Sequence, residues 1–430
     1  MSSRRRMTGP VLILAAIVAS LAAVNLLLRE AGYATTLRYA RMAVEHDATA
    51  DSWRPMLRAL DAWDRGEPVY ETVFFGEHVK FQYPLTTLFL PMAMRSPTRT
   101  GTTLIRALNR ASLAATLVFI ACTTALFVVT WFGPRPDWSE WAIWFGVGIV
   151  ITGSALFHPA LMSYVLGQIQ SFVNAALAAM LLAWRLNRRV AAGVALALGC
   201  LIKPHLGLLV LWGLLRRAWS FAAAAAIVIA LGATAAVAVF GIRDNVDYAR
   251  VVSFMAARGE AITANQSVNG LLNRLVQPPE AREWDFHSFP PPNAIVRAGT
   301  LVGALLLVGT ALVLPPRLGF GGSALDIAIA ALSVTMASPI AWDHHYGVLL
   351  PALILASGVA LRLPAPRRWW FAALGVAFAL GGSMWEPLAF VADPPANLLQ
   401  SYVLAAGVAS LLVMYRLGPL AAQAARPAGE

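Results

Sequence analysis

Long apolar runs are the feature that most constrains the fold of this chain. Many of them approach the length of about 20 residues that a helix needs to cross a hydrocarbon core. Of the 430 residues, 58% are hydrophobic and 13% are charged, whereas soluble domains carry about 25% charged residues. The runs are continuous rather than alternating, which favours helices over barrel strands. We therefore predict an all-α, polytopic membrane protein.

The apolar runs predict about twelve transmembrane helices in a single integral membrane domain, residues 1–430. Arg4–Arg6 place the N-terminus in the cytoplasm, because basic loops stay on that side. Twelve crossings return the C-terminus to the same side. The expected spans are 10–29, 81–96, 111–132, 140–157, 164–184, 190–215, 218–241, 296–315, 323–341, 346–362, 368–388 and 400–416.

The middle of the chain allows two arrangements. Twelve crossings place the basic stretch W-R-L-N-R-R (184–189) outside, against the positive-inside rule. In the alternative, 190–215 is a re-entrant hairpin broken at Lys203-Pro204, and 81–96 does not cross fully. We prefer the twelve-span arrangement. Both place 30–80 and 242–295 outside as two long loops.

Asp51, in the first outer loop, is the first candidate for chemistry. A carboxylate at the mouth of a helix bundle can accept a proton from a hydroxyl nucleophile. Asp51 also precedes a stretch whose apolar residues between Met56 and Trp63 recur at helical spacing, with Gly66 as a natural stop. An Asp at a helix start commonly caps it, and the sequence alone favours the cap.

The stretch W-D-H-H (342–345) lies between two apolar runs. Histidine can hydrogen-bond a phosphate, relay a proton or bind a metal, but no third ligand at diagnostic spacing indicates a metal site. The alternative is an aromatic belt at the membrane interface, although Asp343 adds a charge that a belt does not need. Adjacent residues on a helix point in different directions, so we expect at most one of His344 and His345 to face a given cavity.

Two cations have competing interpretations. Lys203 and Pro204 interrupt an apolar run. Polar groups at membrane depth usually face a cavity, but a lysine near a helix end can also extend its amine to the interface. Arg274, in the second outer loop, either binds phosphate bidentately or is a solvated loop residue. The net charge of +11 does not indicate a nucleic-acid partner, because the arginines cluster at span ends.

The order of motifs carries a family resemblance. After Asp51 come R-G-E-P-V-Y (65–70), F-Q-Y-P-L (81–85), M-S-Y-V-L-G-Q-I-Q (162–170), A-G-V-A-L-A-L-G-C-L-I-K-P-H (192–205), N-Q-S-V-N-G-L-L-N-R (265–274) and S-P-I-A-W-D-H-H-Y (338–346). This order resembles the polyprenyl-phosphate-dependent glycosyltransferases of family 87, which have the membrane-embedded C-type fold. The resemblance covers nearly the whole chain.

The resemblance implies inverting transfer of a sugar on the outer face of the cell membrane. The donor would be a polyprenyl-phosphate sugar within the membrane lipid, the acceptor a glycolipid or glycan, and mannose is the family's best-known sugar. No cofactor is implied. Asp51 would activate the acceptor, with Asp47 as its rival. The expected substrate-binding residues are His344, His345, Arg274, Lys203, Trp342, Tyr83 and Gln168.

A lipid or solute transporter is the main alternative. Transporters place charged sites on broken helices in repeated halves, and Lys203-Pro204 fits that description. We find no matching second broken helix, which fits a transporter poorly. A non-catalytic scaffold would leave the convergence of polar residues unexplained.

Overall fold

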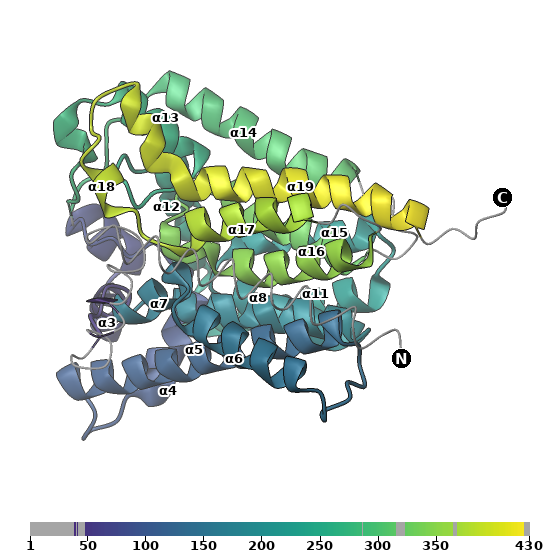
Figure 1. The fold of residues 1–430 in the computed structure, drawn as a ribbon. Helices are drawn as coiled ribbons and strands as arrows, with labels where there is room; N and C mark the ends of the chain where they lie inside the picture. The colour runs from purple at the N-terminus through teal and green to yellow at the C-terminus, as the bar shows by residue number, and fades with distance from the viewer. Residues whose placement is uncertain are drawn as a thin grey trace.

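The computed structural model describes residues 38–39, 41, 48–285, 287–314, 323–363 and 368–424. Within these ranges every regular element is a helix, and the long helices pack side by side along one direction (Figure 1). The expected span 10–29 and the alternative base Asp47 lie outside the described residues.

The elements before the middle of the chain are α3 (Trp53–Asp64), the π-helix η1 (Tyr70–Gly76), η2 (Leu85–Leu88), α4 (Phe89–Met94), α5 (Gly101–Trp131), α6 (Trp141–Ala155), α7 (His158–Val165), α8 (Gln170–Arg185), α9 (Arg189–Cys200), η3 (Pro204–Gly207) and α10 (Leu208–Leu215). They are followed by α11 (Trp219–Phe240), α12 (Ile242–Arg258), α13 (Val268–Val276), η4 (Pro279–Arg282), α14 (Ala294–Val313), α15 (Ala324–Met336), η5 (Asp343–Val348), α16 (Leu349–Arg362), α17 (Arg368–Gly382), α18 (Glu386–Ala389), η6 (Ala396–Ser401) and α19 (Tyr402–Ala424).

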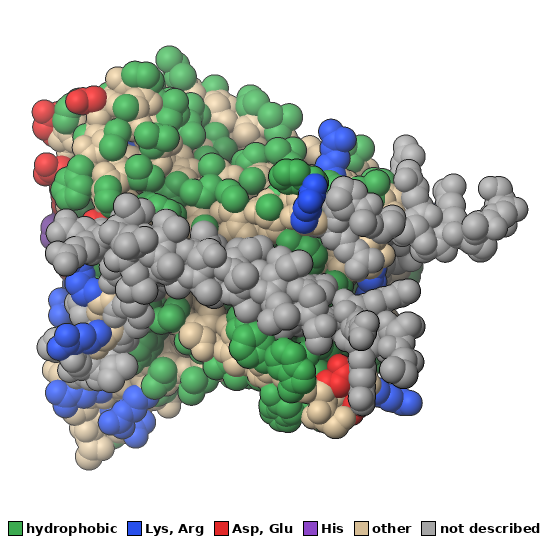
Figure 2. Space-filling model, in the orientation of Figure 1, with side chains coloured by type: hydrophobic (Ala, Val, Ile, Leu, Met, Phe, Trp, Pro, Cys, Tyr) green, Lys and Arg blue, Asp and Glu red, His purple; other side chains and the backbone are tan. Residues whose placement is uncertain are grey.

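Five of the described helical segments are long and apolar enough to span a membrane: α5, α11, α14, Asp343–Arg362 and Ala396–Leu420. The pair α6 and α7, bent by 48°, adds a sixth if it forms one span. Charged side chains gather toward two ends of the face in Figure 2, with hydrophobic side chains between them. The chain is therefore a helical membrane protein, but twelve complete spans are not confirmed.

The expected span 81–96 is wrong. The segment begins with extended backbone at Pro84, continues as the short helices η2 and α4, and ends at Met94 with Arg95 extended again. Proline has no amide hydrogen and forces the preceding residue out of the helical region. A continuous helix therefore cannot run through this segment, which stays too short to cross a bilayer.

The segment 190–215 does not form a single transmembrane span. It folds back on itself as a hairpin. Arg189, at the start of α9, lies 3.6 Å from the centre of the Trp184 ring. Trp184 packs edge-on against Trp212, near the end of α10, with ring centres 5.1 Å apart. The two ends of the hairpin therefore lie together, and the chain reverses at Lys203, whose extended backbone separates α9 from η3.

The hairpin ends belong to a basic end of the bundle. Arg216 pairs with Asp326 at 2.7 Å and donates to the carbonyls of Ala311 and Leu312 in the last turn of α14. Arg185 and Arg362 likewise donate to carbonyls in the last turn of α5. Arginine is favourable there because the final carbonyls of a helix lack intrahelical partners. The stretch 184–189 thus lies on the side of the other arginines.

Burial separates an inner set of helices from an outer set. The side chains from Leu325 to Met336 in α15 are all buried, and α16 is buried along most of its length. By contrast, α11 and α14 expose large apolar side chains such as Leu231 and Leu305. Exposed apolar surface on these helices suits contact with lipid rather than water.

Gly193 gives a test of the packing between α9 and α11. A β-carbon at Gly193 would lie 2.3 Å from the carbonyl oxygen of Phe221, so the two helices must separate if a side chain is added. We expect Gly193→Ala to lower the free energy of unfolding by about 1–3 kcal/mol, measured by SDS titration in mixed micelles. Gly148→Ala in α6 has open space and should not destabilise the protein.

Candidate functional site

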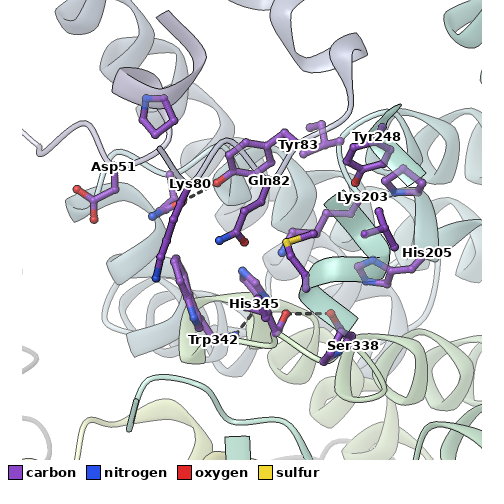
Figure 3. A pocket seen from close by; sticks show the side chains of 18 of the residues that line it. Asp51, Lys80, Gln82, Tyr83, Lys203, His205, Tyr248, Ser338, Trp342 and His345 are labelled. Atoms are coloured by element: carbon purple, nitrogen blue, oxygen red, sulfur yellow. Dashed lines mark hydrogen bonds between the residues drawn. The ribbon is translucent and has the colours of Figure 1, made fainter. Parts of the chain in front are cut away.

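A cavity of about 870 Å³ is lined by the side chains drawn in Figure 3. The cavity is bounded by η5 and by the turn between α9 and α10. Since η5 begins the span Asp343–Arg362, the cavity lies at the opposite end of that span from Arg362. Its polar lining residues are Asp51, Arg54, Arg58, Lys80, Gln82, Tyr83, Gln168, Lys203, His205, Tyr248, His287, Ser338, Trp342 and His345. The structure thus brings Asp51, Tyr83, Gln168, Lys203, Trp342 and His345 together as expected.

Asp51 is placed by a backbone contact with the turn between α7 and α8. The Thr49 amide donates to the Val165 carbonyl at 2.9 Å, and the Asp51 amide donates to the Leu166 carbonyl at 3.1 Å. Gly167 permits this approach, because its φ is +56° and a β-carbon there would lie 2.0 Å from the Thr49 oxygen. The Gly in L-G-Q-I-Q therefore belongs to the site through its backbone.

The Asp51 carboxylate is not a helix cap. Ser52 precedes α3, and Asp51 accepts a hydrogen bond from Thr49 Oγ1 at 3.0 Å. Desolvation by the surrounding protein raises the pKa of Asp51 above its usual value; the Thr49 hydrogen bond and the charges of His344 and Arg54 oppose this shift. A carboxylate with a raised pKa is a stronger base than an exposed one.

Ser52 connects the polar residues next to Asp51. Its buried hydroxyl lies 2.6 Å from Gln168 Oε1 and 2.8 Å from the Tyr83 hydroxyl, and it accepts the Ile169 amide at 3.1 Å. Burial raises the pKa of Tyr83 to about 12, so the phenol stays protonated and can donate. Tyr83 and Gln168 therefore sit in fixed positions beside Asp51.

The W-D-H-H stretch begins η5, and its two imidazoles differ in position. His345 lines the cavity, and its Nδ1 accepts the Trp342 amide at 3.2 Å, so the neutral ring carries its proton on Nε2. His344 is 1% exposed and does not line the cavity. The expectation that at most one of the two faces the cavity is confirmed.

Asp343 joins His344 to a histidine from a distant part of the chain. Its carboxylate lies 3.3 Å from His344 Nδ1 and 3.3 Å from Nε2 of the buried His158 in α7. The charge of Asp343 is thus used to hold η5 against α7. Within the described ranges, no three His, Cys, Asp or Glu side chains form a group that could hold a metal ion.

Lys203 and His205 form the opposite wall. In Figure 3 they lie across the cavity from Asp51. Lys203 has no ion pair or side-chain hydrogen bond with any residue that the structure describes. A break in an apolar hairpin therefore presents the Lys203 amine to the cavity, with no ion-pair partner among the described residues.

Arg274 lies away from the cavity wall. It is in α13, is 1% exposed, and donates to the carbonyls of Ile262 and Asn265 at 2.8 Å each and to the Ser401 hydroxyl at 2.5 Å. It is therefore not the solvated loop residue of one expectation, and its donors are used to hold neighbouring loops. We do not carry Arg274 into the proposed site.

Several site residues were missed in the sequence. His158 interrupts an apolar run in the same way as Lys203-Pro204 does, so a sequence signal was available for it. Arg54 and Arg58, one turn apart on α3, also line the cavity, and helical spacing could have indicated that they share a face. The role of Ser52 had no local signal, because its partners lie far along the chain.

Comparison with known families gives one match. The model of glycosyltransferase family 87 matches residues 81–339, more than half of the chain. The matched range includes Tyr83, Gln168 and Lys203 but neither Asp51 nor W-D-H-H. No curated protein matches the chain.

Ser52 offers a test of this geometry. We expect Ser52→Ala to lower the free energy of unfolding by about 1–3 kcal/mol, because it leaves buried polar partners without their hydrogen bonds. Unfolding by SDS titration in mixed micelles measures this. Ser253→Ala, at an exposed serine in α12, should stay within about 0.5 kcal/mol of the wild type; equal effects of the two substitutions would contradict the role of Ser52.

Proposed function

This chain belongs to glycosyltransferase family 87, and on that basis we propose that it moves a sugar from a polyprenyl-phosphate donor to a hydroxyl of a glycolipid or glycan acceptor. The reaction is a single displacement that inverts the anomeric centre, in the C-type architecture. Mannose is proposed as the sugar on the family resemblance alone. Family membership favours a transferase over a transporter.

One observation carries the proposal: a carboxylate and an unpaired cation line the same cavity. Asp51 lies on one wall, and Lys203, with His205 and His345 nearby, lies on another. The volume of about 870 Å³ leaves space between them for a sugar and its phosphate. A base opposite an anion-binding wall is the arrangement that glycosyl transfer from a phosphate requires.

The donor phosphate would bind at the Lys203 wall. Lysine and the protonated Nε2 of His345 both donate hydrogen bonds, and phosphate oxygens accept them. The apolar residues Ala304 and Val308, one turn apart on α14, also line the cavity. Since α14 exposes apolar side chains outward, this flank provides a route by which the polyprenyl chain reaches the lipid.

The acceptor hydroxyl would bind at Asp51. Its oxygen attacks the anomeric carbon as its proton moves to the Asp51 carboxylate, and the bond between that carbon and the phosphate oxygen breaks. The electron pair stays on the phosphate, where Lys203 and His345 stabilise the developing charge. Tyr83 and Gln168, held by Ser52, lie beside Asp51 and would orient the acceptor.

The cavity is proposed to open on the outer face of the cell membrane. The basic end, with Arg185, Arg216 and Arg362, lies at the other end of the bundle. Basic segments stay in the cytoplasm, so the cavity would face outward. Neither 190–215 nor 81–96 makes a full crossing. Removing these two crossings keeps the number of crossings even, so both termini remain on the cytoplasmic side in this proposal.

The base assignment predicts that Asp51→Asn lowers kcat by about 10²–10⁴-fold, because an amide cannot accept the proton. The assay uses detergent-solubilised protein, radiolabelled polyprenyl-phosphate mannose and a lipid extract as acceptor. Asp61→Asn, at an exposed position of α3, should keep full activity. Full activity of Asp51→Asn would defeat the assignment, and label crossing vesicles without bond change would favour transport.

The raised pKa of Asp51 predicts an acidic limb in the pH dependence of kcat/KM. Asp51 must be deprotonated to act, so activity falls as pH falls through its raised pKa. Thr49→Val removes a hydrogen bond that lowers this pKa, so the limb should move to higher pH. Thr102→Val, at an exposed position in α5, serves as the control. A limb that does not move, or moves to lower pH, would contradict Asp51 as the titrating base.

A further inference from the structure

The cations in the cavity wall differ in how they are neutralised. Arg58 pairs with Glu77, and Lys80 pairs with Glu260 at 2.9 Å. Neither Glu77 nor Glu260 lines the cavity, so each acid lies behind the wall. Lys203 has no such partner among the described residues. Arg54 also lines the cavity, but it lies in the field of the Asp51 carboxylate. Among the described residues, Lys203 is therefore the lining cation that no acid faces.

Glu260 is the more buried of the two acids. Its side chain is 3% exposed and that of Lys80 is 9% exposed. One carboxylate oxygen accepts the Lys80 ammonium, and the other accepts the Trp342 indole at 2.6 Å. The Glu260 carbonyl also accepts the Asn265 amide group at 2.9 Å. Glu260 is thus held from both ends and cannot move away from Lys80 without losing these bonds.

Lys80 is enclosed on its other sides by aromatic rings. Its ammonium nitrogen lies 4.1 Å from the centre of the Trp284 ring and 4.4 Å from that of Phe289. Both rings attract the cation through their faces. In Figure 3, Lys80 and Trp342 lie on the side of the cavity toward Asp51, and Lys203 lies on the other side. Without Glu260, Lys80 would add an unneutralised cation to the side of the cavity that already holds Asp51 and Arg54.

We propose that Glu260 is a specificity-determining residue that masks Lys80, so that an anionic group binds at Lys203 and not on the Asp51 side. The ligand class is a phosphate monoester or diester carried by the donor. A phosphate bound at Lys80 would lie on the Asp51 side of the cavity, where the acceptor is proposed to bind. The biological role of this masking rests on the proposed function, but the masking can be measured by phosphate binding alone.

The masking predicts a pattern of phosphate affinities. The probe is inorganic phosphate, and the readout is the shift of the thermal unfolding midpoint of the full chain in detergent, at ionic strength held constant with sodium chloride. We expect Lys203→Met to weaken phosphate binding at least tenfold. Adding Glu260→Gln should restore affinity at least tenfold, and adding Lys80→Met to that pair should abolish the gain.

Two control variants separate masking from simple structural support. Lys80→Met combined with Glu260→Gln removes both charges of the pair and should leave phosphate affinity unchanged when Lys203 is present, since a masked lysine contributes nothing. Trp342→Phe removes the indole donor without freeing Lys80 and should create no new phosphate site. The amide oxygen of Gln can still accept the Trp342 indole, so Glu260→Gln is expected to fold. Unfolding midpoints without phosphate check this for every variant.

Three outcomes overturn the inference. In the Lys203→Met background, Glu260→Gln adds no phosphate affinity, or its gain survives Lys80→Met. With Lys203 present, the double substitution Lys80→Met and Glu260→Gln weakens phosphate binding. Failure of the proposed function looks different. If Lys203→Met leaves phosphate binding unchanged, the proposed donor site is wrong. The comparison of Glu260→Gln with and without Lys80→Met still tests whether Glu260 masks Lys80. In the transfer assay, Glu260→Gln should lower kcat/KM and the double substitution should recover it.

Discussion

The contact between residues 49–51 and the turn Val165–Gly167 is the constraint on which the rest of the site depends. It positions the start of α3 by backbone hydrogen bonds rather than by flexible side chains. Ser52 then reaches Gln168 and Tyr83, and Asp51 is left facing the cavity. A side chain at Gly167 would collide with the Thr49 carbonyl, so this close approach depends on a residue with no β-carbon.

Interrupted helices supply the opposite wall. The break between α9 and α10 and the short turn η5 expose backbone and polar side chains at positions where continuous helices would present apolar ones. Irregular backbone at membrane depth is tolerated where protein or a water-filled cavity covers it. The cavity is therefore what allows Lys203 and His345 to remain inside an otherwise apolar bundle.

The charges around the cavity are distributed unevenly, and this gives the site a direction. Acids behind the wall neutralise Arg58 and Lys80, whereas Lys203 stays unpaired among the described residues. Asp51 lies on the other side of the cavity, where the nearby charge of Arg54 offsets only part of the rise in its pKa. A substrate with one anionic end is thereby oriented by electrostatics before any specific contact with its sugar is made.

The sequence by itself determined the helical membrane class, the helix that follows Asp51 and the polar breaks at Lys203 and W-D-H-H, because apolar periodicity and proline act locally. It favoured full crossings at 81–96 and 190–215, whereas the structure has the arrangement that the sequence allowed as an alternative, with a hairpin at 190–215 and an incomplete 81–96. Only the tertiary structure decided that Asp343 meets His158, that Glu260 holds Lys80, and that Ser52 joins Gln168 to Tyr83. These partners are far apart along the chain, and no local pattern reports which helices pack together or which buried donor finds which acceptor.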